Sequence, residues 1–192
     1  VDEVNLLPAP VSDAILDAAA QGAYTIRHGG LSATYWSRFI LIGSMNPAEG
    51  SLRPQIMDRF GLRVYVHPLE EPQARLAAYQ RTQQYRQNPQ QYALLFNEEM
   101  EAARLEIIAA RKLLPSVQLD SDAADLGASL IKHLGIQSLR AEIALFEAAR
   151  AHAAAAGREN AGTEDVLVVA PLALRLRRAG DKLPDPQSEE EE

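Results

Sequence analysis

Two adjacent acids stand near the start of the chain. Asp2 and Glu3 lie in the segment VDEVNLL, which is expected to be the end of a strand turning into a loop. An acid at the end of a buried strand can hold Mg²⁺, directly or through water, and an acid beside it can polarise a water for attack on a phosphoryl group. A solvated pair on a surface loop is the alternative, because an acid dipeptide carries little information.

A polar side chain follows a short apolar run. Asn46 lies in GSMNP, directly after the run FILIG at 39–43. Such a run is typical of a strand buried on both faces of a parallel sheet, and ligands of open α/β sheets bind beyond the carboxyl ends of the strands. The amide of Asn46 could therefore orient an attacking water or contact a γ-phosphate. The alternative is an ordinary Asn-Pro turn.

Two arginines are candidates for binding phosphate. Arg59 lies in RPQIMDRFG, and Arg140 lies in SLRAE at the start of an expected helix. An arginine at a helix end can stabilise phosphoryl-transfer charge in a neighbouring subunit, which is the action of an arginine finger. Arg140 could reach the same phosphates. The alternatives are a salt bridge of Arg59 with Asp58 or another acid, a finger at Arg53 instead, and a solvated helix charge at Arg140.

The other polar side chains point less clearly to chemistry. The four histidines share no ligand spacing and no neighbouring acid cluster, so a structural metal site is not expected at His28, His67, His133 or His152. A group of arginines near the end of the chain is interpreted as complementing the dipole at a helix C-terminus: Arg175, Arg177 and Arg178.

Apolar spacing divides the chain into an α/β part and a helical part. In the first part we expect a helix at 11–21 that ends at Gly22, and a hairpin at 23–36 that turns at Gly29-Gly30. We also expect strands at 39–43 and 62–66, with a short helix at 53–60 between them. Strands alternating with helices argue for an α/β sheet. Beyond a boundary at Pro68 to Pro72, spacings of three and four predict helices through 100–114, 126–134, 139–153 and 166–178.

Composition sets further limits. The chain has 192 residues, 47% of them hydrophobic, which suffices for one large domain or two small ones. The net charge is −7, of which −5 falls on the tail from Ala179, so the body is near neutral and has no electrostatic footprint for nucleic acid. No apolar run approaches the roughly 20 residues of a membrane helix. The absence of cysteine fits a reducing compartment, and we expect a cytoplasmic protein.

Taken together and in order, these segments resemble the ATPase subunit of magnesium chelatase, a family of the AAA+ superfamily. The resemblance runs from residue 1 to about 178 and is most specific over 38–62; its segments are VDEVNLL, IRHGGLS, RFILIGSMNPAEGSLRPQIMDRFGL, KLLPSVQLD and LRAEIALFEAARAHAAAAGR. It implies part of an α/β AAA+ P-loop core with a β-hairpin before the sensor-1 position, followed by an all-α lid domain.

The resemblance also implies a role for each candidate. Asp2 and Glu3 match the Walker B acids, so Asp2 would bind Mg²⁺ and Glu3 would activate water. Asn46 matches sensor 1 and would be both catalytic and in contact with ATP. Arg59 matches the arginine finger that serves the nucleotide of the neighbouring subunit, and Arg140 matches sensor 2, a nucleotide-binding position.

The family forms hexameric rings whose ATP hydrolysis drives Mg²⁺ insertion into protoporphyrin IX by a separate large subunit, joined through an intermediate subunit. ATP and Mg²⁺ are thus the implied cofactors, and a homo-oligomeric ring and other chelatase subunits the implied partners. The resemblance implies three domains. Residues 1–70 would be the C-terminal part of the AAA+ core, from Walker B to the finger; residues 71–178 would be a helical lid with sensor 2; and residues 179–192 would be a disordered acidic tail or linker.

The chain departs from the family pattern in two places. No G-x-x-x-x-G-K-S/T phosphate loop occurs in it, and in the family this loop lies upstream of the position of Val1. We therefore interpret the chain as a C-terminal fragment that should not hydrolyse ATP alone. His28-Gly29-Gly30 also replaces a more usual acidic hairpin tip.

Two other functions remain open at this point. The first is a non-hydrolysing AAA+ scaffold module of the intermediate chelatase subunit, whose Pro-rich acidic linker the segment PDPQSEEEE resembles. The second is a MoxR-like AAA+ chaperone that matures other metalloproteins. An intact phosphate loop in the full-length gene would favour the motor over the scaffold.

Overall fold

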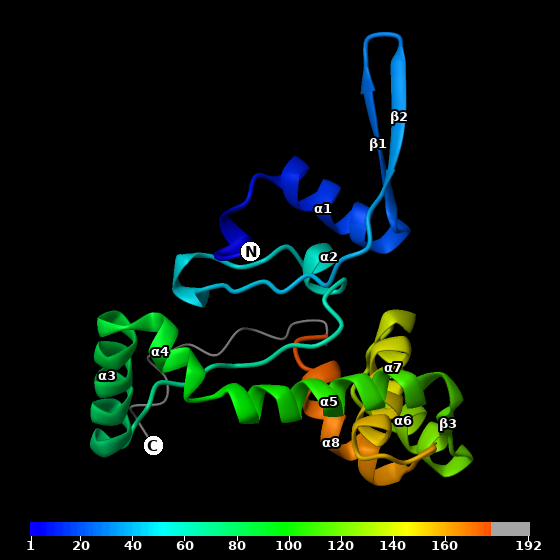
Figure 1. Cartoon of the computed structure of the whole chain (residues 1–192). Helices are drawn as coiled ribbons and strands as arrows, with labels where there is room; N and C mark the ends of the chain where they lie inside the picture. Colours follow the sequence, from blue (N-terminus) through cyan, green and yellow to red (C-terminus); the bar gives the residue numbers. More distant parts are fainter. Residues whose placement is uncertain (178–192) are drawn as a thin grey trace. The chain divides into compact units, whose positions relative to one another are not determined.

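The computed structural model describes residues 1–177, which fold as two compact units (Figure 1). The first unit contains 1–61, 135–140 and the segment beginning at Leu176, and the second contains 62–134 and 141–175. The acidic tail predicted at 179–192 lies outside the described residues. The predicted boundary at 70/71 stays a prediction.

The first unit begins with a short 3-10 helix, η1 (Val4–Leu6), and the helix α1 (Ala9–Gln21). Proline in the first turn of α1 suits a helix start, because the N–H that it lacks would have no intrahelical partner there. The helix ends at Gly22, whose φ of 67° is left-handed and whose N–H bonds the carbonyl of Ala18. The predicted helix and its glycine stop are thereby confirmed.

A β-hairpin follows, made of β1 (Ala23–His28) and β2 (Leu31–Trp36), as predicted. A two-residue loop at Gly29-Gly30 joins the antiparallel strands, and Gly29 has a φ of 59°. Cross-strand pairs hold the register: the Thr25 and Thr34 hydroxyls lie 2.9 Å apart, and the rings of Tyr24 and Tyr35 stack at 5.4 Å. Most of the hairpin's side chains are exposed.

The hydrophobic core of the first unit lies between α1 and the segment that runs from 41 to 60. Its buried members are Val4, Leu16, Leu52 and Ile56. The short helices η2 (Pro47–Glu49) and α2 (Pro54–Met57) belong to this segment. Phe60 packs on the same core, against Gly43, where an added Cβ would stand 3.3 Å from the Phe60 ring.

The strand predicted at 39–43 is not formed. Backbone hydrogen bonds join this segment to the start of the chain: the N-terminus of Val1 donates to the Ile42 carbonyl at 2.8 Å, and the Ser44 N–H donates to the Val1 carbonyl at 3.0 Å. Two such bonds on either side of Gly43 are the hydrogen-bond pattern of a parallel β-bridge between Val1 and Gly43. One such pair is too short to make a ladder, and Ile40 stays 77% exposed.

The strand predicted at 62–66 is likewise not formed. Within the second unit, the Arg63 N–H bonds the Leu172 carbonyl at 2.9 Å, and Val64 and Val66 are exposed. Both predictions were wrong for the same reason. An apolar run shows a preference for the extended backbone, but a strand also needs a neighbouring backbone to pair with.

The second unit is mainly helical. Its helices are α3 (Pro72–Gln87), α4 (Pro89–Leu94), α5 (Asn97–Leu113), α6 (Ser121–His133), α7 (Leu139–Ala155, whose first two residues belong to the first unit) and α8 (Thr163–Ala173). A 3-10 turn, η3 (Leu114–Ser116), leads to β3 (Gln118–Leu119), which pairs in parallel with β4 (Asn160–Ala161). The helices predicted through 100–114, 126–134 and 139–153 are confirmed.

Small residues allow α6, α7 and α8 to pack closely around a core. On α7, Ala141, Leu145, Ala149 and Ala153 recur every fourth residue and are all buried. Gly127 of α6 lies against the ring of Phe146. By contrast, α3 and α5 bury no residue fully.

The last described helix ends earlier than predicted. α8 stops at Ala173, and Leu176 adopts a left-handed φ of 55° beyond it. Arg175 and Arg177 therefore lie beyond the end of the helix. The prediction that they complement the dipole in its last turn is wrong. Arg175 instead stacks on the Tyr65 ring at 4.5 Å. Arg178 lies outside the described residues.

Candidate nucleotide site

The two adjacent acids contact the loop that follows residues 39–43. The Ser44 hydroxyl donates to a carboxylate oxygen of Asp2 and accepts the Glu3 N–H at 3.4 Å. Glu3 has a left-handed φ of 50°, uncommon for a residue with a side chain. Sequence reasoning missed Ser44, although its hydroxyl lies two residues before Asn46 in GSMNP.

Asn46 caps the short helix η2. Its Oδ1 accepts the Ala48 N–H at 3.1 Å, and its Nδ2 donates to Glu49 at 3.4 Å. This is the Asn-Pro turn considered as the alternative for this residue, so in this conformation the amide serves its own loop. The structure brings the Asn46 loop to the acid pair through Ser44.

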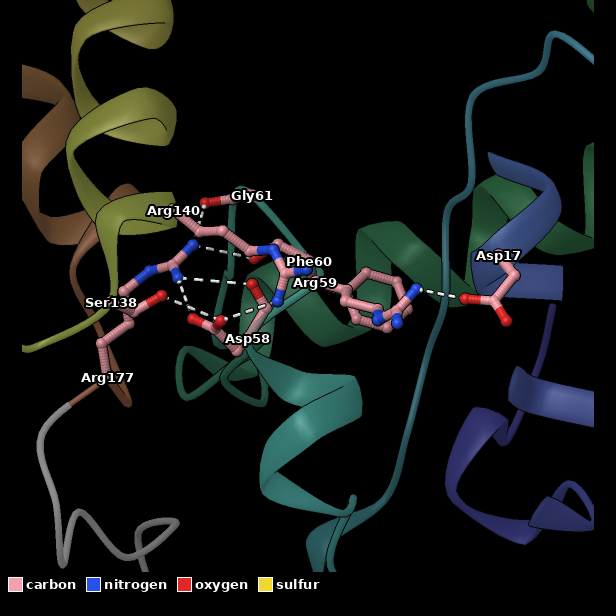
Figure 2. A network of polar contacts seen from close by, with 8 residues as sticks. All are labelled: Asp17, Asp58, Arg59, Phe60, Gly61, Ser138, Arg140 and Arg177. Atoms are coloured by element: carbon pink, nitrogen blue, oxygen red, sulfur yellow. Dashed lines mark hydrogen bonds and ion pairs between the residues drawn. The ribbon is translucent and has the colours of Figure 1, made fainter. Parts of the chain in front are cut away.

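Arg59 directly follows α2 and its C-cap and is held by an acid of α1. Its Nη1 lies 2.7 Å from the Asp17 carboxylate, and its side chain is 33% exposed (Figure 2). The partner is therefore not the neighbouring Asp58. The rival finger, Arg53, lies at the N-cap of α2 and pairs with Asp13 at 2.9 Å.

Asp58 forms the centre of a polar cluster in the first unit (Figure 2). One carboxylate oxygen accepts from the Ser138 hydroxyl at 2.9 Å and from Nη1 of Arg140 at 3.1 Å. The other accepts from Nη1 of Arg177 at 2.6 Å. Sequence reasoning missed both the centre of this cluster and Arg177, because Asp58 meets residues 80 to 119 positions further along the chain.

The cluster keeps Asp58 ionised. Burial would raise the pKa of its carboxyl group, but hydrogen bonds from Ser138 and Arg140 and the positive charge of Arg177 outweigh burial. The pKa of Asp58 is therefore lower than its ordinary value. The arrangement is one carboxylate shared by two guanidinium groups, with one positive charge in excess.

Arg59 and Arg140 line one cavity of about 280 Å³ in the first unit. Its other lining residues are Leu16, Ala19, Ala20, Leu41, Phe60 and Gly61. Asp2, Glu3 and Asn46 do not belong to this lining. The predicted site residues thus fall into two groups, an acid pair beside the Ser44–Asn46 loop and a pair of arginines at a cavity. The first group offers oxygen ligands and the second offers donors for an anion.

A further buried charge lies in the second unit. Asp165 of α8 is fully buried and accepts from the Gly162 N–H at 2.9 Å and from Arg158 Nη1 at 2.7 Å, and His152 Nδ1 lies 2.6 Å from it. The Arg158 hydrogen bond is the largest effect on its pKa and, with those from His152 and Gly162, outweighs burial, so the pKa lies far below the ordinary value. Sequence reasoning missed this partner of His152.

No group of three or more His, Cys, Asp or Glu side chains among residues 1–177 is arranged to hold a metal ion. Over the same residues, no helix is both long enough and apolar enough to cross a membrane.

Comparisons with known proteins agree with this architecture. The family model of the AAA lid domain matches residues 125–192. The chain is also similar to a solved structure of a candidate ATPase from Cytophaga hutchinsonii, with a TM-score of 0.67 and 22% identity over 92% of this chain and 57% of that one. At this identity the likeness supports the fold alone. The predicted fold class, an α/β part of an AAA+ core followed by a helical lid, is confirmed.

Similarity to curated proteins is stronger. The chain is 39% identical to the magnesium-chelatase subunit ChlI of Anabaena variabilis, over 95% of this chain and 54% of that protein. It is 42% identical to a magnesium-chelatase subunit ChlI homolog of Methanocaldococcus jannaschii, over 93% of this chain and 49% of that protein. It is 39% identical to the chloroplastic ChlI of Glycine max, over 95% and 44%.

The chain therefore spans about half the length of the curated relatives that it matches. The similarity nevertheless covers 93 to 95% of this chain. Over nearly its whole length the chain is therefore similar to about half of these magnesium-chelatase subunits, and its fold is that of an AAA+ protein.

Proposed function

We propose that the protein is the ATPase motor subunit of a magnesium-chelatase-like complex, in which ATP hydrolysis drives insertion of Mg²⁺ into protoporphyrin IX. The observation that carries the proposal is the 39–42% identity to chelatase subunits over at least 93% of this chain. The cavity lined by Arg59 and Arg140 supports it, because two guanidinium groups at one cavity suit a triphosphate held between adjacent subunits.

In this proposal the acid pair serves the Mg²⁺ that accompanies ATP. Mg²⁺ prefers oxygen ligands, and the carboxylate of Asp2 beside the Ser44 hydroxyl offers two. When bound, the ion neutralises charge on the phosphates. Glu3 is the base that polarises the attacking water. Asn46, as sensor 1, exchanges its bond with Glu49 for the water or the γ-phosphate.

The arginines bind the phosphates. Arg59 acts as the finger toward the nucleotide of a neighbouring subunit, and Arg140 acts as sensor 2. Each is ion-paired with one acid here, Arg59 with Asp17 and Arg140 with Asp58. A triphosphate carries more negative charge than one carboxylate, so it can compete with Asp17 for Arg59, whereas Arg140 keeps its Nη1 bond to Asp58 and has other N–H donors for the phosphates.

The function requires assembly with other chains. A finger that serves a neighbour needs a homo-oligomeric ring, which we propose is a hexamer, and the insertion step needs the other chelatase subunits. Residues 1–70 would be the C-terminal part of the ATPase core, 71–178 the lid and 179–192 a linker. The absence of cysteine is in keeping with a cytoplasmic location.

The test is reconstitution. The full-length protein would be combined with the large and intermediate chelatase subunits, Mg²⁺, ATP and protoporphyrin IX, and insertion followed by the change in porphyrin fluorescence. We expect insertion only with hydrolysable ATP. ATP turnover without insertion, under conditions in which a known motor subunit supports it, would refute the chelatase assignment and favour a MoxR-like chaperone.

A second candidate is a scaffold module of the intermediate subunit, which the Pro-rich acidic segment PDPQSEEEE favours. The scaffold would support insertion only when another ATPase subunit is added, and would show no turnover of its own. Measuring ATP hydrolysis by the full-length protein alone separates the two candidates. The 192-residue chain itself contains no phosphate-loop motif, and we expect no turnover from it.

A further inference from the structure

The two arginines that share Asp58 differ in how firmly they are held. Arg177 is 1% exposed, and besides the carboxylate it donates to the backbone carbonyls of Asp58, Phe60 and Gly61 at 3.2 to 3.4 Å. Arg140 is 55% exposed and contacts Asp58 through Nη1. Arg177 is therefore the fixed partner of Asp58, and Arg140 is the accessible one.

The single contact of Arg140 has a consequence for ligand binding. A guanidinium has five N–H donors in a rigid plane, and the bond to Asp58 uses Nη1. Fixing one corner of the plane limits its rotation and leaves Nε and Nη2 for an anion in the cavity that Arg140 lines. Less side-chain entropy is then lost when the anion binds.

The charge of Asp58 does not work against an anion. Arg177 neutralises it from the buried side, and the Ser138 hydroxyl fills a further acceptor position. Asp58, Arg177 and Arg140 together carry one positive charge. Asp58 also caps α2 directly before Arg59, so it fixes the backbone from which the second cavity-lining arginine projects.

We propose that Asp58, held by Arg177, is a positioning residue that presents Arg140 to the phosphates of a bound nucleotide. The proposal rests on the proposed function of this cavity as a nucleotide site. Asp58 does not touch the nucleotide. It acts by holding Arg140 in the orientation that the phosphates require.

The test is a double-mutant cycle in the full-length protein, with Asp58→Asn, Arg140→Ala and the double variant. Asparagine keeps the shape of aspartate but removes the charge that holds both guanidiniums. The dissociation constant of a fluorescent ATP analogue with Mg²⁺ would be measured, together with KM and kcat of ATP hydrolysis. The control is Glu101→Gln, which breaks an exposed pair with Arg104 on α5.

For Asp58→Asn we expect about a three- to tenfold rise in the dissociation constant and in KM, with kcat changed less, since one charge-assisted bond is lost. Arg140→Ala should weaken binding at least as much. The double variant should bind no more weakly than Arg140→Ala alone, because Asp58 acts through Arg140. Glu101→Gln should leave the dissociation constant unchanged.

If Asp58 only stabilised the fold, Asp58→Asn would weaken binding by the same factor with or without Arg140. The positioning role predicts different effects on stability and on binding. The contact with Arg177 does not involve Arg140, so Asp58→Asn should lower Tm by a similar amount in both backgrounds, whereas its effect on binding should vanish in the Arg140→Ala background. If Asp58→Asn does not fold, Ser138→Ala removes one bond to the same carboxylate, and we expect about a twofold rise in the dissociation constant.

The outcomes separate the two proposals. Unchanged or tighter binding in Asp58→Asn, or additive effects in the double variant, would overturn the positioning role while nucleotide binding through Arg140 stands. Unchanged binding in Arg140→Ala would instead overturn the assignment of the cavity to nucleotide.

Discussion

Ser44 donates a hydrogen bond to the carboxylate of Asp2, 42 positions earlier in the sequence. The bond ties the start of the chain to the loop that carries Asn46. Backbone bonds between Val1 and the segment at 42–44 reinforce the connection. Four polar side chains that the sequence separates into two segments, Asp2, Glu3, Ser44 and Asn46, therefore belong to one local structure.

Glu3→Gln in the full-length protein should keep nucleotide binding and abolish turnover. Glutamine has the size of glutamate but cannot take a proton from the attacking water, and loss of a general base costs about 10²- to 10⁴-fold in rate. Single-turnover ATP hydrolysis and analogue binding would be measured side by side. Glu70→Gln, at an exposed position, is the control, and normal turnover in Glu3→Gln would remove Glu3 from the mechanism.

Arg59→Ala should leave nucleotide binding mostly intact but stop hydrolysis in the ring, because a finger stabilises charge that develops during phosphoryl transfer and is worth about 10³- to 10⁵-fold. ATPase rates of the assembled protein measure this effect. If Arg59→Ala hydrolysed ATP normally, the finger would move to Arg53.

Mixing variants tests whether the finger acts between subunits. Arg59→Ala and Glu3→Gln subunits are each expected to be inactive alone. In a mixed ring, some interfaces combine an intact Glu3 with an intact neighbouring Arg59, so part of the activity should return. No recovery in rings shown to be mixed would mean that both residues serve the nucleotide of their own subunit.

Ser44→Ala should raise the Mg²⁺ concentration needed for half-maximal ATPase activity by about three- to tenfold, since Asp2 loses the hydroxyl that fixes its carboxylate. The measurement is a Mg²⁺ titration at saturating ATP. Ser116→Ala is the control, because that hydroxyl bonds a backbone carbonyl of the second unit. An unchanged Mg²⁺ requirement would show that Ser44 does not serve the metal-binding acid.

Asp165→Asn should destabilise the protein by about 3 kcal/mol, since it leaves Arg158 and His152 without their buried carboxylate. Urea denaturation at pH 7, followed by circular dichroism, measures the free energy of unfolding. Glu147→Gln, which breaks an exposed pair with Arg150, should change it by less than about 1 kcal/mol.

The same carboxylate predicts a pH dependence. The pKa of Asp165 is lowered in the folded protein, whereas in the unfolded chain it is near 3.9. Its stabilisation is therefore fully present above about pH 5 and is lost as the pH falls through and below 4. The free energy of unfolding should fall more steeply between pH 5 and 2 in the wild type than in Asp165→Asn. Equal slopes would contradict this.

The elements that the sequence predicted well are those that depend on nearby residues. The hairpin follows from Gly29-Gly30 between two runs that contain aromatic and β-branched residues, and α1 ends at Gly22, as predicted. The segments at 39–43 and 62–66 were predicted as strands from composition alone. Pairing depends on backbone from elsewhere, which composition does not report.

The same limit applies to the candidate site. Resemblance to a family identified Asp2, Glu3, Asn46, Arg59 and Arg140, whose roles stay predictions. It did not identify what holds them. Asp58 and Arg177 are 119 positions apart, and neither has a neighbour in sequence that reveals the pair. Positioning contacts arise from the tertiary fold, so local patterns do not predict them.

The close approach of Gly43 and Phe60 has a consequence for how this sequence can change over time. A methyl group at 43 would stand 3.3 Å from the Phe60 ring and from Val4, so alanine there needs the ring to move. The carbonyl of Phe60 accepts a bond from Arg177, which limits that movement. Positions 43 and 60 should therefore covary among homologues: a larger residue at the first should occur with a smaller one at the second.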